Sequence, residues 1–142
     1  MKKHKGQSVV EFALVLPLFL LIMFGIIYTG MMFHDYTTVS NIARSSAREA
    51  AISTISTTNT AEAVYGEIAE HYVDQLDTLM TSFYKKADNN PIVIKPVDIG
   101  TKNEGVESTI TMQLNVSGFF VDMILPKKFG VQYYMKKEPF TS

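Results

Sequence analysis

The sequence predicts an α+β protein in which a long, membrane-spanning N-terminal helix continues into a small exported domain with a second helix and a short antiparallel sheet. Three patterns predict this fold: an uncharged apolar run near the N-terminus, two stretches with apolar residues every three or four positions, and a later stretch of alternating apolar and polar residues. The chain has 142 residues, so only one small domain fits beyond the apolar run.

The apolar run extends from Phe12 to Phe33 and contains no charged residue. At about 1.5 Å per residue, a helix of this length spans a hydrocarbon core about 30 Å thick. Three basic residues precede the run, whereas the next cation after it is Arg44, so we expect the N-terminus in the cytoplasm and the bulk of the chain outside. The basic residues of the leader are Lys2, Lys3 and Lys5.

Two other interpretations of this run are less well supported. A soluble core helix is rarely apolar on every face over such a length. A secretory signal peptide also has a basic start, but its apolar stretch is about half as long. No small-x-small cleavage site stands at the end of the run, where Tyr28-Thr29-Gly30 and its neighbours are bulky.

A single carboxylate, Glu11, stands at the mouth of the apolar run. A carboxylate near the end of a membrane helix costs a few kcal/mol and is usually paired. Position 7 lies one helical turn before it, on the same face. Cleavage between Gly6 and Gln7 would create a positive α-amino group there, able to meet Glu11 of the same chain or of a neighbouring copy. The cut would also remove the leader lysines and leave the helix on the product.

These residues resemble a known signal. Lys3-His4-Lys5-Gly6, followed by Gln7-Ser8-Val9-Val10-Glu11-Phe12, resembles the class III signal of type IV pilin-like proteins. The longer phrase GQSVVEFALVLPLFLLIMFGIIYTG resembles the start of the TadE-like minor pseudopilins of tight-adherence (Flp, type IVc) pili. The stretch from Ile42 to Ala51 resembles the A-R-x-x-A-R-x-A segment that follows in that family.

The resemblance implies a pilin-like fold and a minor pseudopilin, a structural subunit for pilus assembly that is connected with cell adhesion and secretion. It implies cleavage after Gly6 by an integral-membrane aspartic prepilin peptidase, with Gln7 as the mature N-terminus. Glu11 then becomes the fifth mature residue, used in assembly or in recognition by the peptidase, with the aromatic Phe12 beside it. The implied partners are the prepilin peptidase, other pilins and pseudopilins, and the assembly platform in the membrane. The implied location is the inner or cytoplasmic membrane, with incorporation into an extracellular pilus.

On this interpretation the chain divides into a prepilin leader (1–6), a transmembrane and assembly helix (7–33), a helix extension and break (34–58), and an exported α+β domain (59–142). A stripe of mostly small residues at helical spacing predicts the extension and allows another helix to approach closely. The stretch STISTTNT, from Ser53 to Thr60, is a poor helix propagator and predicts the break. The stripe consists of Val39, Ile42, Ala43, Ser46, Ala47 and Ala50.

The exported domain is expected to begin with a second helix. Asn59 with Glu62 three residues later is a cap-like start, and an apolar stripe runs from there to about Ala87. The Asp88-Asn89-Asn90-Pro91 segment is expected to end this helix. The stripe consists of Ala61, Val64, Tyr65, Ile68, Tyr72, Leu76, Leu79, Met80 and Phe83.

After this segment the apolar period changes to two. Alternation from Val106 to Val116 predicts a half-buried antiparallel strand. We expect residues 92–99 to pair with it as a hairpin across Gly100 to Gly105, with Pro96 confining that partner to a sheet edge. A third strand is expected at residues 130–137. Such a sheet must cover the helices with one face.

The sequence offers no recognisable catalytic apparatus, so we expect a protein that is not an enzyme and needs no cofactor or metal. Glu67 and His71 lie one turn apart on the second helix, as some metal ligands do, but a surface pair is the better interpretation. No clustered basic face suggests nucleic-acid binding, and there is no cysteine. Five carboxylates on the polar side of the second helix are expected to be solvated: Glu62, Glu67, Glu70, Asp74 and Asp77.

Two aromatic stretches, Phe119-Phe120-Val121 and Tyr133-Tyr134-Met135, are expected to place one ring in the core and one at its rim, with a contact surface as the alternative. A second hypothesis for the whole chain also stays open. In it the chain is a single-pass anchored extracytoplasmic binding domain that keeps its leader and never enters a filament.

Overall fold

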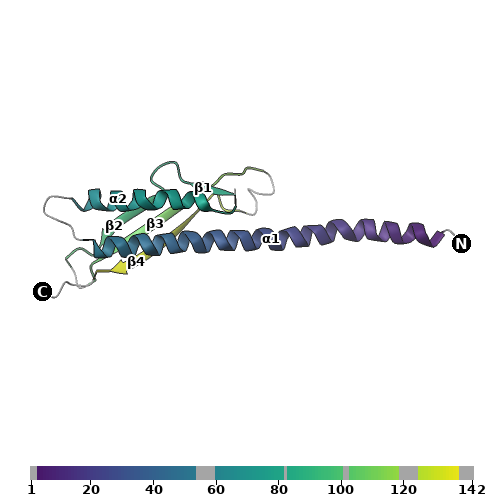
Figure 1. The fold of residues 1–142 in the computed structure, drawn as a ribbon, viewed down its shortest axis with the longest axis horizontal. Coiled ribbons are helices and arrows are strands. Elements are labelled where there is room, and N and C mark those ends of the chain that lie inside the picture. Colours follow the sequence, from purple (N-terminus) through teal and green to yellow (C-terminus); the bar gives the residue numbers. More distant parts are fainter. Residues whose placement is uncertain (1–2, 54–59, 82, 101–102, 119–124, 138–142) are drawn as a thin grey trace.

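A single helix forms the long axis of the molecule, and its N-terminal half projects away from the rest of the chain (Figure 1). The computed structural model describes residues 3–53, 60–81, 83–100, 103–118 and 125–137, with side chains from residue 8 onward. Helix α1 runs over Lys3–Ile52, 50 residues, or about 75 Å at about 1.5 Å per residue. The predicted continuation of the helix beyond Phe33 is therefore confirmed.

Pro17 lies inside α1 and does not end it. Proline removes one backbone hydrogen bond and would destabilise this helix in water, whereas a helix in a membrane tolerates it where the freed backbone groups find other partners. The helix ends one residue before Ser53, at the start of the predicted break; residues 54–59 of that segment lie outside the described residues.

The second half of α1 packs on a small α+β head. All six residues of the predicted stripe are buried, namely Val39, Ile42, Ala43, Ser46, Ala47 and Ala50. Their small side chains admit a sheet strand as well as the expected second helix, since the Oγ atoms of Ser46 and of Ser108 in the sheet are 2.8 Å apart. The hydroxyl of Tyr72 on the second helix also donates to the Glu49 carboxylate at 2.8 Å.

The second helix is shorter than predicted. α2 covers Ala61–Val73, and a 3-10 turn, η1, continues over Asp74–Thr78. The N-cap is Thr60 rather than Asn59, which lies outside the described residues, and Thr60 makes no side-chain cap bond. The predicted end near Ala87 is wrong, because the chain becomes a strand before that point.

Four antiparallel strands form one sheet: β1 (Tyr84–Lys86), β2 (Ile92–Val97), β3 (Gly105–Leu114) and β4 (Lys128–Lys136). β3 is central. One of its edges pairs with β4 over nearly its full length, and the other is shared by β2 and, at its end, β1. The predicted strands and hairpin are confirmed, and β2, which contains Pro96, is an edge strand as expected.

The predicted helix terminator is a turn between strands instead. Asp88-Asn89-Asn90-Pro91 connects β1 to β2, and Asn90 has a φ of 47°. This is the left-handed backbone region, which asparagine tolerates better than most residues. The two short strands can therefore follow one another along the same edge of β3.

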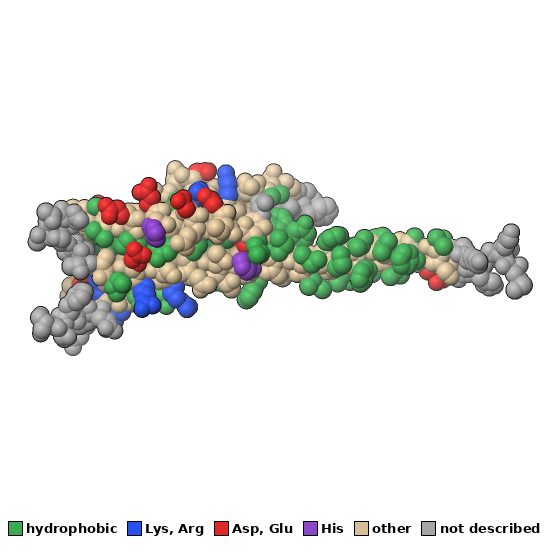
Figure 2. Space-filling view, viewed as in Figure 1, with side chains coloured by type: hydrophobic (Ala, Val, Ile, Leu, Met, Phe, Trp, Pro, Cys, Tyr) green, Lys and Arg blue, Asp and Glu red, His purple; other side chains and the backbone are tan. Residues whose placement is uncertain are grey.

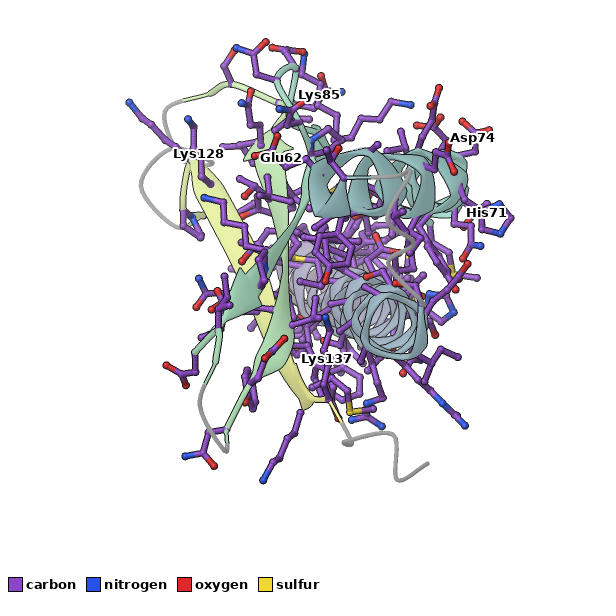
Figure 3. The ribbon with its side chains drawn as sticks, turned by 90° about the vertical axis from the view of Figure 1, so that its left-hand side faces the viewer. Glu62, His71, Asp74, Lys85, Lys128 and Lys137 are labelled. Atoms are coloured by element: carbon purple, nitrogen blue, oxygen red, sulfur yellow. The ribbon has the colours of Figure 1, made fainter. Side chains whose placement is uncertain are left out.

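The head has two layers, with α1 and α2 side by side on one face of the sheet (Figure 3). The inward side chains of β3 alternate with half-buried ones on the open face, which confirms the predicted period of two. The inward residues are Val106, Ser108, Ile110 and Met112. A sheet this small needs such a cover to be stable.

Candidate functional site

The predicted processing signal lies at the free end of the projecting helix. Gly6 and Gln7 fall in the first turns of α1, as do Lys3 and Lys5; the side chains of these four residues are not described, and Lys2 lies outside the described residues. Positions 7 and 11 are four residues apart in one continuous helix, so they share a face. The backbone geometry that the pairing hypothesis needs is therefore present.

Glu11 and Phe12 are both exposed, and Phe12 keeps 65% of its surface. They lie well away from the head, at the far end of the helix (Figure 1). The head of the protein therefore does not cover these two side chains.

The apolar run that follows is not covered by the protein. One helix among the described residues is long and apolar enough to cross a membrane, and none of its most apolar window is buried. Figure 2 shows hydrophobic side chains along the visible face of this projecting segment. Thr29, a polar residue within the run, donates its hydroxyl to the carbonyl of Gly25 at 2.7 Å. A core helix would bury this surface, so the segment is suited to lipid or to other apolar helices.

A buried carboxylate joins the helix to the head just beyond the apolar run. Asp35 is 5% exposed and accepts hydrogen bonds from the backbone N–H groups of Met80 and Thr81, both at 2.8 Å. The Thr81 hydroxyl also donates to it, and Nδ1 of His34 lies 3.7 Å from its Oδ1. We call Asp35, Met80 and Thr81 the clasp.

The clasp keeps Asp35 ionised. Burial alone raises the pKa of this carboxyl, but the hydrogen bonds from Thr81, from the Met80 backbone and from His34 outweigh burial and hold the pKa below its ordinary value of 3.8. The negative charge therefore persists at neutral pH, and three donors of the segment after η1 are fixed to one point on α1.

Sequence reasoning did not identify the clasp, because it assigned no role to Asp35. The donors lie 45 and 46 positions further along the chain, so no local pattern connects them. The available signal was the one used for Glu11: a lone carboxylate beside an apolar helix needs a partner.

A second group of polar contacts fixes the distal half of α1. Ser46 and Ser108 are both fully buried, and Ser46 also donates to the carbonyl of Ala43 at 3.1 Å. Burial, followed by the neighbouring Glu49 carboxylate, raises the pKa of the Tyr72 hydroxyl. These groups have structural partners, so they connect the helix to the head rather than form a reactive centre.

The other residues considered for chemistry lie on the surface. Glu67 and His71 are exposed, as are the remaining carboxylates on the polar side of α2 and η1, so the predicted solvated face is confirmed. Among the described residues, no group of three or more His, Asp or Glu side chains lies close enough to hold a metal ion. Tyr133 packs against the core and Tyr134 is 45% exposed, as predicted, while residues 119–121 lie outside the described residues.

An uncovered apolar helix of membrane-spanning length with a small α+β head on its far half is consistent with the class of single-pass membrane-anchored proteins. Residues 6–48 match the family model described as TadE-like protein, so the N-terminal third of the chain is similar to TadE-like proteins. The match begins at the glycine before the predicted cut and ends within the head-bearing half of α1. No curated protein and no solved structure matches the chain.

Proposed function

We propose that this protein is a minor pseudopilin, a non-catalytic structural subunit for assembly of a tight-adherence type IV-like pilus. The observation that carries the proposal is the continuity of three features on one helix: the Gly6, Glu11 and Phe12 spacing, the uncovered apolar surface, and the TadE-like match over residues 6–48. The family supports a role connected with the Tad pilus, and the following steps describe how this chain would fill it.

The first step is removal of the leader. A prepilin peptidase in the membrane hydrolyses the bond between Gly6 and Gln7, which leaves a carboxylate on Gly6 and a free amino group on Gln7. The α-amino group has an ordinary pKa of about 7.7–8.0, so it is largely protonated at neutral pH. Cleavage thereby exchanges the lysine charges of the leader for one cation at the new end of the helix.

The second step pairs that cation with Glu11. A carboxylate held within the edge of the bilayer costs a few kcal/mol, which an adjacent ammonium reduces. Within one chain the two groups are one turn apart; between chains, the new amino terminus of one subunit meets Glu11 of its neighbour. The intermolecular pair would also set how far one helix is displaced along the next.

The third step moves the helix from lipid into a bundle of like helices. Most of its large apolar side chains are exposed along the projecting half, so other pilins and pseudopilins can cover them without any unfolding of the head. The assembly platform in the membrane would carry out this transfer. With a cytoplasmic N-terminus, the head lies outside the cytoplasm throughout.

Replacement of Gly6 tests the first step. We expect Gly6→Leu to abolish processing in cells that contain a prepilin peptidase, and the unprocessed chain to remain in the membrane with its leader. The measurement is the intact mass of the membrane-extracted protein, since removal of residues 1–6 changes it by the mass of the leader.

Gly25→Leu is the matched control. A Cβ atom added at Gly25 meets nothing within 4 Å, so we expect the same substitution further along the helix to leave the fold intact and processing normal. Unchanged processing of Gly6→Leu would refute the assigned cut site. An intact leader in the Gly25→Leu variant and in the unaltered protein would instead support an anchored extracytoplasmic binding domain that is never assembled.

A further inference from the structure

The end of the head nearest the projecting helix carries exposed apolar side chains. Phe33, Tyr36 and Met80 keep 69%, 52% and 59% of their surface. Phe83, from the segment between η1 and β1, is half-buried, and its ring lies edge-on against Tyr28 of α1 with ring centroids 5.6 Å apart. We call Phe33, Tyr36, Met80 and Phe83 the base surface.

The base surface reaches back alongside the membrane segment. Tyr28 precedes Phe33, the end of the apolar run, by five positions, which corresponds to about 7.5 Å along the helix. A hydrocarbon core takes about 20 helical residues, and such a count from Phe12 ends at Met31. The head therefore touches α1 at or just inside the depth at which the hydrocarbon ends.

The clasp fixes this arrangement. The backbone N–H of Met80 is bonded to Asp35, seven positions beyond Tyr28, while Phe83 contacts Tyr28 itself. The same short segment is thus held to α1 at two points on either side of Phe33. Met80 and Phe83 cannot move away from α1 unless these contacts break.

We propose that the base surface is seated in the interfacial layer of the bilayer, with phospholipid as its occupant. The hydrophobic surface of the projecting helix runs onto this end of the head (Figure 2), so lipid that covers one also reaches the other. Tyrosine is enriched at membrane–water interfaces, where an apolar ring and a polar hydroxyl both find suitable surroundings. Lys127 and Lys128, exposed where β4 begins at the same end of the sheet, complement lipid phosphates.

The inference rests on insertion of α1 in a bilayer and does not require cleavage or pilus assembly. It assigns the head a fixed depth and orientation before any assembly step. Extraction into a filament would then have to remove the base surface from lipid as well as the helix.

The absence of cysteine from the chain allows a direct test with single-cysteine variants of the full-length protein. Met80→Cys carries an environment-sensitive fluorophore in the base surface. Ile99→Cys is the matched control, because Ile99 is also apolar and 72% exposed but follows β2 at the opposite end of the sheet. Each labelled protein is reconstituted in vesicles of phosphatidylethanolamine and phosphatidylglycerol.

We expect the probe at position 80 to be quenched several-fold more by nitroxide-labelled lipid, and several-fold less by aqueous iodide, than the probe at position 99. A probe at Tyr36→Cys should show the same quenching as the probe at Met80→Cys, and agreement of the two positions would exclude a folding defect in one variant as the cause. Equal quenching at the two ends of the head would overturn the proposal. Shielding of position 80 that disappears as the lipid-to-protein ratio rises would also overturn it, since a second copy would then be the occupant.

Discussion

Replacement of Asp35 by asparagine should loosen the attachment of the head to α1 without unfolding either. The carboxylate accepts three hydrogen bonds from Met80 and Thr81. Asparagine keeps one acceptor oxygen and turns its amide hydrogens toward a former donor. The loss of at least one bond to a charged group, worth about 1.5–3 kcal/mol net, leaves a buried N–H or O–H without its partner.

The expected cost is therefore about 2–3 kcal/mol for the clasp. Because 1.4 kcal/mol corresponds to a factor of ten in an equilibrium constant, the local opening equilibrium should rise about 30- to 150-fold. Amide hydrogen exchange of Met80 and Thr81 reports this opening directly, since both N–H groups are bonded to Asp35. Amides in the centre of β3 should keep their protection.

Asp77→Asn provides the matched control. Asp77 pairs with Lys86 at 2.8 Å, but its side chain is 61% exposed, and exposed ion pairs contribute little to stability. Exchange at residues 80 and 81 should be unchanged in this variant. If Asp35→Asn also left that exchange unchanged, the clasp would not hold the segment and the reasoning from its hydrogen bonds would be refuted.

Three further predictions follow from particular contacts. Because the folded state holds the pKa of Asp35 below 3.8, the clasp is fully stable above that pH and weakens as the pH falls through the lowered value. The hydrogen-exchange protection factor of the Met80 amide should therefore decline only below about pH 4. A decline between pH 7 and pH 5 would argue against an ionised clasp. Gly105→Ala would place its methyl group 2.6 Å from the carbonyl oxygen of Met135 and should destabilise the head by about 1–3 kcal/mol in denaturant unfolding. The control Gly66→Ala, whose added methyl group meets nothing within 4 Å, should stabilise the head by about 0.5–1 kcal/mol. Equal effects of the two substitutions would contradict the close packing of the strands at Gly105. Glu11→Gln should leave membrane insertion unchanged or improved but reduce pilus output, and normal output would count against the pairing role.

The periodic parts of the fold could be predicted from the sequence because burial itself creates the period. Each residue of the stripe from Val39 to Ala50 is buried, and the alternation along β3 matches its inward face. The end of α2 could not be predicted in the same way. Leu76 in η1 and Phe83 before β1 continue a helix-like spacing although neither lies in an α-helix, and the pairing of Tyr84 with Leu114 overrides the local pattern.

A candidate site could be proposed from the sequence only where its signal is local. Gly6, Glu11 and Phe12 lie within seven consecutive residues, and the backbone confirms that positions 7 and 11 share one continuous helix. Asp35 acquires its role from residues brought close by the tertiary fold, so its spacing carries no information. The two cases differ in the distance between partners along the chain: the residues of the processing signal are neighbours in sequence, whereas Asp35 and its donors are 45 and 46 positions apart.

The N-terminus of the mature protein tests the central claim most directly. Intact mass and N-terminal peptide analysis of the protein, extracted from membranes of cells that contain a prepilin peptidase, should identify a chain that begins at Gln7 and retains the whole apolar helix. A chain that still begins with the lysine-rich leader under those conditions would contradict the proposal that cleavage creates a cation that pairs with Glu11.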